Sequence, residues 1–220
     1  MKKQITGLFL IAVLIVTPTV LAEEPQVSSS DPNDDEIGSK TVVYFNTVFG
    51  ELAKAAEKAP DYDTYREVMK SIAENTKGFY GGTLLGPDWV INQVYYPSHF
   101  LARGYDLKKV KELTAFIKLM KETPAPQLSE PGHGSLIQPR LIAMRYPVVK
   151  DEKVTSIISI MVKTEEYLKA VGLDKCKAYK ITCLGTLAEE KGKLPKDAKQ
   201  VKLKLPSTEW VIEYQKENKK

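Results

Sequence analysis

Side chains that bind metals or act as nucleophiles are scarce in this chain of 220 residues, which holds two cysteines and two histidines. The histidines, His99 and His133, lie far apart in the sequence and no cluster of carboxylates accompanies them, which argues against a zinc site. No glycine-rich loop of the kind that binds phosphate groups is present. The sequence therefore predicts neither a metal ion nor another cofactor.

The chain also lacks a strong excess of charge of either sign. Its formal net charge is +4, and Lys2 and Lys3 at the N-terminus supply two of those charges. A bias this small does not support binding to nucleic acid or to an anionic membrane. Arginine is rare among the basic residues, and a guanidinium can hold a carboxylate or phosphate with two hydrogen bonds. The best candidates for fixed anion contacts are therefore Arg66, Arg103, Arg140 and Arg145.

One short apolar run, residues 8–16, follows the first lysines and is broken at residues 17–19. It is too short to span a bilayer comfortably, and small residues precede Glu23. We interpret residues 1–22 as a signal peptide cleaved after Ala22, which predicts a periplasmic or secreted protein. An uncleaved anchor is the alternative. The polar, acidic residues 23–38 are expected to form a flexible linker.

Residues 39–78 show helical periodicity, with apolar side chains three or four positions apart. Pro60 ends the first predicted helix, Asp61 or Asp63 caps the second, and Gly78 closes it. A further helix is expected from Asp106, and residues 123–135 are expected to form a loop.

Two hairpins are predicted from paired apolar runs separated by short polar connectors. The first joins residues 79–85 to 90–96 through a tight turn at Pro87 and Asp88, and the second joins residues 136–149 to 154–162. Parallel strands would need longer crossovers, so the strands should be antiparallel. Residues 164–173 should form a helix with Thr164 as its N-cap and Gly172 at its end.

The last part of the chain predicts strands at residues 178–184, 201–205 and 209–214, with a connector rich in lysine and glutamate before the second of them. Taken together, the order of elements predicts an α+β fold. An antiparallel sheet would carry long helices on one face and an irregular cap on the other.

The second hairpin, with Tyr146-Pro147 near the end of one strand and a short acidic helix after the next, resembles the second half of an extracellular Cache (PAS-like) sensor domain. The resemblance covers residues 39–216, with a sensor core at residues 79–216. It implies a small polar or anionic ligand held between the sheet and the segments that cover it. It also implies a membrane receptor or histidine kinase as partner, and a homodimer through the N-terminal helix. The pattern does not identify the ligand.

For such a pocket, the resemblance and the residue types favour aromatic walls with arginine as the anion contact. Arg140 and Tyr146 have the same strand parity, whereas Arg145 points to the opposite face. Each aromatic side chain is also explained by ordinary packing. The predicted ligand-binding residues are Tyr80, Trp89, Tyr105, Arg140, Arg145 and Tyr146.

Two other functions remain open at this point: an exported hydrolase-like enzyme that uses His133, and a structural envelope protein with a filled pocket. The neighbours His133 and Ser135 lack the strand-turn-helix context of a nucleophile elbow, so we expect no enzyme. Export would permit a disulfide between Cys176 and Cys183. One straight strand over these residues would hold the two about 23 Å apart, so a bridge requires the chain to fold back.

Overall fold

A computed structural model describes residues 35–96, 103–132 and 139–217. The predicted signal peptide, most of the predicted linker, His99 and His133 lie outside the described residues. Among the helices of the described part, none is both long enough and apolar enough to cross a membrane.

The described chain is an α+β fold in which every strand pairing is antiparallel, as the sequence predicts. The helices are α1 (Glu36–Glu57), α2 (Tyr65–Asn75), α3 (Thr114–Glu122) and α4 (Thr164–Val171). The strands are β1 (Phe79–Leu85), β2 (Ile91–Tyr95), β3 (Gln127–Leu128), β4 (Leu141–Lys150), β5 (Lys153–Lys163), β6 (Cys176–Cys183), β7 (Thr186–Lys191), β8 (Lys199–Leu205) and β9 (Thr208–Lys216).

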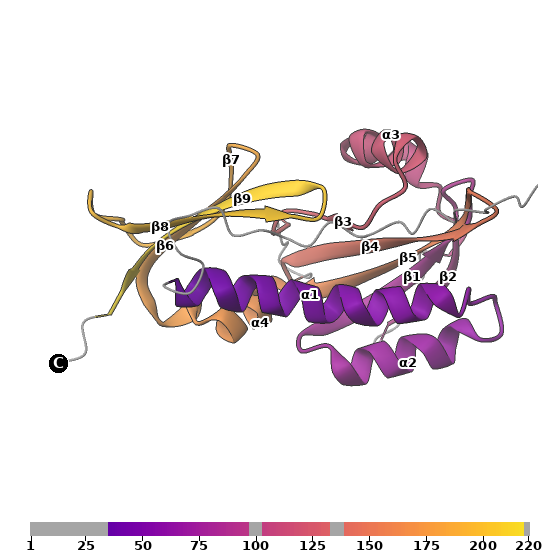
Figure 1. Ribbon diagram of the computed structural model, residues 1–220, viewed down its shortest axis with the longest axis horizontal. Helices are drawn as coiled ribbons and strands as arrows, with labels where there is room; N and C mark the ends of the chain where they lie inside the picture. Colours follow the sequence, from indigo (N-terminus) through magenta and orange to yellow (C-terminus); the bar gives the residue numbers. More distant parts are fainter. Residues whose placement is uncertain (1–34, 97–102, 133–138, 218–220) are drawn as a thin grey trace, which may run out of the picture.

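The strands form two sheets where the sequence predicted one. The first has the order β2–β1–β5–β4–β3 and the second the order β7–β6–β9–β8. Helix α4 and a 3-10 turn at Leu173–Lys175 redirect the chain after β5, so β6 to β9 pair among themselves. Figure 1 shows the two sheets one after the other along the long axis, with α1 running beside both.

Helix α1 joins the two sheets into one hydrophobic core. It begins at Glu36, three residues before the expected start, because the Asp35 side chain accepts a hydrogen bond from the Gly38 amide at 2.7 Å. From its buried face, the fully buried Phe45 ring stacks on Tyr167 of α4 at 5.1 Å and meets the edge of Trp210 of β9 at 5.2 Å. Residues of α1, α4 and both sheets therefore belong to a single core cluster.

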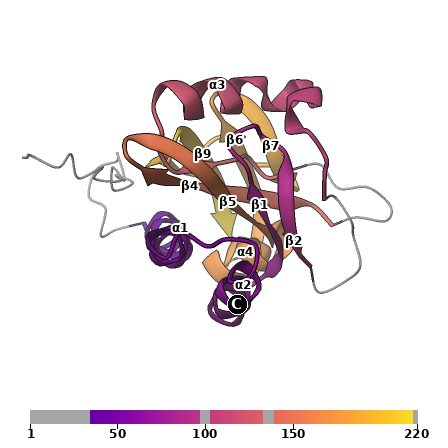
Figure 2. The ribbon, with the colours of Figure 1, turned by 90° about the vertical axis from the view of Figure 1, so that its right-hand side faces the viewer.

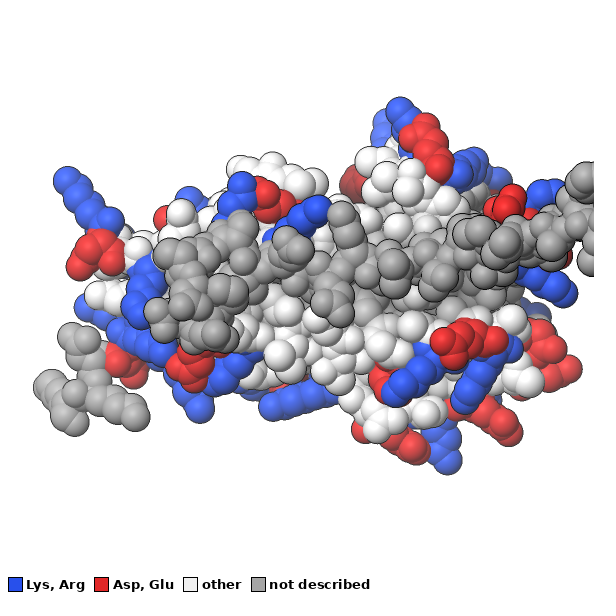
Figure 3. Space-filling model, in the orientation of Figure 1, with Lys and Arg blue, Asp and Glu red and all other residues white. Residues whose placement is uncertain are grey.

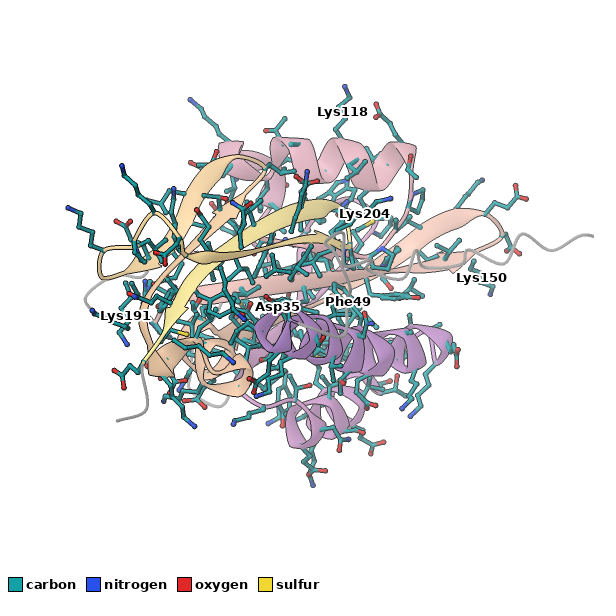
Figure 4. The ribbon with its side chains drawn as sticks, turned by 60° about the vertical axis from the view of Figure 1, so that its left-hand side comes forward. Asp35, Phe49, Lys118, Lys150, Lys191 and Lys204 are labelled. Carbon is teal, nitrogen blue, oxygen red and sulfur yellow. The ribbon has the colours of Figure 1, made fainter. Side chains whose placement is uncertain are left out.

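The first sheet is covered on both faces. Helices α1 and α2 lie on one face and α3 on the other (Figure 2). In Figure 4, Phe49 of α1 and Lys118 of α3 are labelled on opposite sides of the sheet. Beneath α3 a second, smaller core forms around Trp89, Phe116 and Met120. The helix expected from Asp106 starts as two 3-10 turns, the first capped by the Asp106 carboxylate, before α3 begins at Thr114.

The two ends of the described chain meet at one pole of the molecule. The Tyr214 hydroxyl donates to the Asp35 carboxylate at 3.0 Å, and the Lys216 ammonium pairs with Glu36 at 2.6 Å. These contacts hold the start of α1 against the end of β9, on the left in Figure 1.

Three local predictions need correction or completion. Thr164 is not the N-cap of α4, because β5 runs directly into the helix and the Thr164 amide donates to the Arg140 carbonyl oxygen; Lys163 takes the cap position. The predicted connector rich in lysine and glutamate contains β7, whose polar composition suits an edge strand. Cys176 and Cys183 are free thiols at the two ends of β6.

The turn between β4 and β5 offers a simple test of the backbone. Asp151 and Glu152 occupy its two central positions with φ of 50° and 61°, the left-handed region that favours glycine. Glu152→Gly is therefore expected to raise the free energy of unfolding by about 0.5–1 kcal/mol. Urea denaturation would measure the change. The control is Lys153→Gly in the adjoining strand, which should destabilise the fold, and an equal effect of both variants would contradict the assignment.

Candidate functional site

Strand β4 presents its two kinds of side chain to opposite faces of the first sheet. Tyr146 packs against the main core, on the side of α1 and α2, with Met144 and Val148. Arg145 lies on the other face, where its guanidinium stacks over the Phe116 ring of α3 at 4.4 Å. This is the alternation that strand parity predicts. The face beneath α3 is therefore where an arginine could meet a ligand.

Arg145 belongs to a row of polar residues that crosses this face. The row consists of Gln127, Arg145, Ser159 and Thr83, which are directly opposite one another on β3, β4, β5 and β1. Directly opposite residues project from the same face of a sheet. The other three are buried, with exposures of 5–6%. Four polar residues side by side on a covered sheet face require partners, so we call this set the polar row and take it as the candidate site.

The hydrogen-bonding groups of the polar row are largely unused within the described residues. Only Gln127 makes a side-chain hydrogen bond there, to the Phe116 carbonyl oxygen at 3.5 Å. Arg145 forms no ion pair with any described carboxylate, although the charge of Glu130 acts on it. Burial lowers the pKa of the Arg145 guanidinium to about 10, so the group stays charged at neutral pH but is poorly solvated. An anion placed beside it would be stabilised.

Of the other predicted site residues, Trp89 shares a contact partner with Arg145 of the polar row. It is buried beneath α3, and its ring meets the edge of Phe116 at 5.6 Å, so Trp89 and Arg145 both contact the same ring. Its backbone has φ of 70°, and its indole N–H has no partner among the described residues. An unusual backbone conformation and an unused donor on one side chain are features that collect at binding sites.

Tyr80 and Tyr105 are placed differently. The Tyr80 ring meets the edge of Tyr96, with the two centroids 5.9 Å apart. Tyr105 is about half exposed, and its carbonyl oxygen accepts a hydrogen bond from the Ile91 amide at the edge of β2. The structure thus brings Trp89 and Arg145 together, whereas Tyr105 and Tyr146 are elsewhere.

Arg140, just before β4, is already neutralised. Its guanidinium donates to both carboxylate oxygens of Glu189, a buried residue of β7 whose side chain is 2% exposed. The Tyr179 hydroxyl approaches the same carboxylate at 3.5 Å. Because β7 belongs to the second sheet, this ion pair ties the two sheets together. Arg140 therefore has a structural partner, unlike Arg145.

Sequence reasoning did not single out Thr83, Gln127 or Ser159. Two of them could have been found in the sequence, because each is a lone hydroxyl in an otherwise apolar run: Thr83 at the centre of residues 81–85, and Ser159 at the centre of residues 157–161. Gln127 gave no signal, because it lies in a segment expected to be a loop. The candidate catalytic neighbours, His133 and Ser135, lie outside the described residues.

A separate groove of about 450 Å³ lies at the outer edge of the first sheet and contains none of the six predicted residues. It is lined by Asp61, Tyr62, Leu84, Val90, Ile91, Asn92, Gln93, Arg103 and Gly104.

No family model and no curated protein matches the sequence. Solved structures do match the fold. The ligand-binding domain of the Pseudomonas aeruginosa PAO1 amino acid chemoreceptor PctC, in complex with GABA, is 11% identical with a TM-score of 0.56, and the match covers 81% of this chain and 93% of that one. The ligand-binding domain of the Pseudomonas fluorescens chemoreceptor CtaA, in complex with L-leucine, is 10% identical with a TM-score of 0.58, over 81% and 88% of the two chains.

The chain has a Cache-like fold. An extracellular ligand binding receptor from Desulfohalobium retbaense shares it, at 15% identity and a TM-score of 0.59 over 81% of this chain. The present chain spans about two fifths of that receptor's length, since the match covers 39% of it. At these identities the likeness establishes the Cache-like fold, which the resemblance of the second hairpin predicted, and leaves the ligand to be inferred from the site.

Proposed function

We propose that this protein is an exported sensor-type domain that binds a small carboxylate-bearing ligand at the polar row. The observation that carries the proposal is Arg145, a charged and poorly solvated guanidinium that no described carboxylate neutralises. Buried charges are normally paired, so an unpaired one in a covered face is suited to a ligand of opposite charge. The PctC and CtaA domains were solved with GABA and L-leucine, both of which carry a carboxylate.

The chemistry of the row favours a carboxylate over a neutral polar group. A guanidinium can donate two parallel hydrogen bonds to the two oxygens of a carboxylate. The hydroxyls of Ser159 and Thr83, next along the row, can donate to the same oxygens. Trp89, which contacts the same Phe116 ring as Arg145, would form an aromatic wall of the site. Arg140 is not the anion contact in this proposal, because Glu189 occupies its donors.

The partner is part of the proposal. A domain of this kind would pass its signal to a membrane receptor or a histidine kinase, as the chemoreceptor origin of PctC and CtaA suggests. Charges of both signs are interspersed over the face shown in Figure 3, which favours a specific protein contact over binding to a polyanion. The outward face of α1, where Val43 is 63% exposed, is the surface we propose for pairing with a second copy.

The test is a ligand screen followed by one substitution. Small carboxylates, amines, nucleobases and sugars would be screened by thermal shift with the mature protein, with GABA and L-leucine included. For the compound that binds, Arg145→Met should weaken binding by about ten- to a hundredfold, because one charge-assisted hydrogen bond contributes roughly 1.5–3 kcal/mol. Isothermal titration would measure the dissociation constants.

Arg66→Met is the matched control, since Arg66 lies on α2, on the opposite face of the sheet, and should leave the affinity unchanged. Equal affinity of the wild type and Arg145→Met would remove the polar row as the site. Equal binding of the corresponding amide, which lacks the negative charge, would contradict the choice of a carboxylate.

A further inference from the structure

The groove at the edge of the first sheet is built from three segments. Its floor is the hairpin of β1 and β2, where Leu84 and Ile91 are each 5% exposed. One wall is the connection between α1 and α2, at Asp61 and Tyr62, and the other is formed by Arg103 and Gly104. It shares no residue with the polar row, so the two places can be tested separately.

Hydrogen bonds to β2 fix both walls. The Gln93 side-chain amide donates to the Tyr62 carbonyl oxygen at 3.4 Å, which holds the first wall. The Gly104 amide donates to the Ile91 carbonyl oxygen at 2.8 Å, and the Ile91 amide donates to Tyr105 at 3.0 Å, which hold the second. The backbone on either side of the groove is therefore anchored to the same strand, and the groove is preformed.

Arg103 places a positive charge over this groove. Its guanidinium donates to the Tyr62 hydroxyl at 2.9 Å and lies over the Tyr62 ring at 4.8 Å, so the side chain bridges the two walls. A guanidinium has five N–H donors, and this contact uses one of them. Among the residues that the structure describes, no carboxylate pairs with Arg103. Most of its donors remain free for a ligand.

Asp61 also lines the groove, and hydrogen bonds within its own loop hold its carboxylate. One carboxylate oxygen accepts hydrogen bonds from the Asp63 amide, the Thr64 amide and the Thr64 hydroxyl, at 3.1, 3.0 and 2.8 Å. The bonds from Thr64 lower the pKa of Asp61, because they stabilise the carboxylate form. The N-terminus of α2 follows directly and favours a negative charge there. Asp61 keeps its negative charge, but these donors engage its Oδ1 atom, so Arg103 is the charged group in the groove with donors left for an anion.

We propose that this groove is a second binding site, for a small oxyanion that carries an apolar group, such as an aromatic carboxylate. The oxyanion would bind to Arg103 and to the amide of Asn92, and the apolar group would cover Leu84 and Ile91. Tyr62 is a positioning residue, because it holds the guanidinium over the groove. This inference does not depend on the function proposed for the polar row.

The probe is benzoate, titrated into the mature protein while amide chemical shifts are followed by NMR. Benzoate should shift the Gly104 amide and the Gln93 side-chain amide. Arg103→Gln should weaken its binding by about tenfold, and Tyr62→Phe by a smaller factor. Both side chains are exposed, so neither variant should disturb folding. The control is Lys118→Met on α3, on the other face of the sheet, which should bind benzoate as the wild type does.

Four results would overturn the proposal. The first is the absence of saturable benzoate binding, and the second is equal affinity in the wild type and Arg103→Gln. The third is a loss of binding in Arg145→Met together with shifts of Ser159 and Thr83, which would place benzoate in the polar row. Benzyl alcohol, which has the same ring without the charge, should not shift Gly104, and a shift as large as that of benzoate would show that Arg103 is not the contact.

Discussion

Arg145→Met is expected to raise the free energy of unfolding of the ligand-free protein by roughly 1–3 kcal/mol. The lowered pKa of the guanidinium, about 10, reflects the desolvation of a charge that no described ion pair offsets. Methionine has a similar volume and no charge, so the substitution removes this desolvation cost. It also removes the stacking on Phe116, which contributes about 0.5–1 kcal/mol of stability.

Arg140→Met, five residues away, should have the opposite effect. It would leave the Glu189 carboxylate buried without a cation, and removing one partner of a buried pair costs about 3–5 kcal/mol. Arg140 itself is about half exposed and water can reach the pair, so we expect a loss nearer 2–3 kcal/mol. Urea denaturation of the two variants in the same buffer would measure both. Destabilisation by Arg145→Met would mean that the guanidinium has a partner that stabilises it.

Phe45→Ala is expected to cost about 3–5 kcal/mol, the range for removing a fully buried aromatic ring. Phe45 contacts Tyr167 of α4 and Trp210 of the second sheet from a helix that also covers the first sheet. A cavity at this point should therefore weaken both sheets. Urea unfolding monitored by tryptophan fluorescence can follow the unfolding of each sheet separately, because Trp89 lies beside the first sheet and Trp210 lies in the second.

Each tryptophan would be observed alone, in a variant that replaces the other by phenylalanine. With Phe45 in place, we expect both tryptophans to report the same unfolding transition. Val43→Ala, on the exposed face of the same helix, should change the free energy by less than about 0.5 kcal/mol. If Phe45→Ala lowered the Trp210 transition and left that of Trp89 in place, the sheets would be independent units instead of one core.

The parts of this fold that could be predicted from the sequence are those set by short-range chemistry. The turn at Pro87 and Asp88 and the short connector after Lys150 forced antiparallel hairpins, and strand parity placed Arg145 and Tyr146 on opposite faces. The division into two sheets could not be predicted, because the alternating strands after α4 would suit either sheet equally well. Their partners are decided by how the chain leaves α4.

The candidate site shows the same limit. Arg140 and Arg145 are the same residue type in one predicted strand, and only strand parity distinguishes them. Their difference arises from Glu189, nearly fifty residues later, in a stretch whose composition indicated a solvated connector. Likewise the polar row is assembled across strands β3, β4, β5 and β1, so its members become neighbours only once the register is known.

The contacts between the start of α1 and the end of β9 affect how this fold can be combined with others. Since the Asp35 and Tyr214 side chains are in hydrogen-bond contact, the two ends of the described chain lie side by side. A unit of this kind can be inserted into a surface loop of a host protein without forcing the two sides of that loop apart. Because Glu36 and Lys216 pair at the same place, movement of one sheet against the other would reach both junctions of such an insertion together.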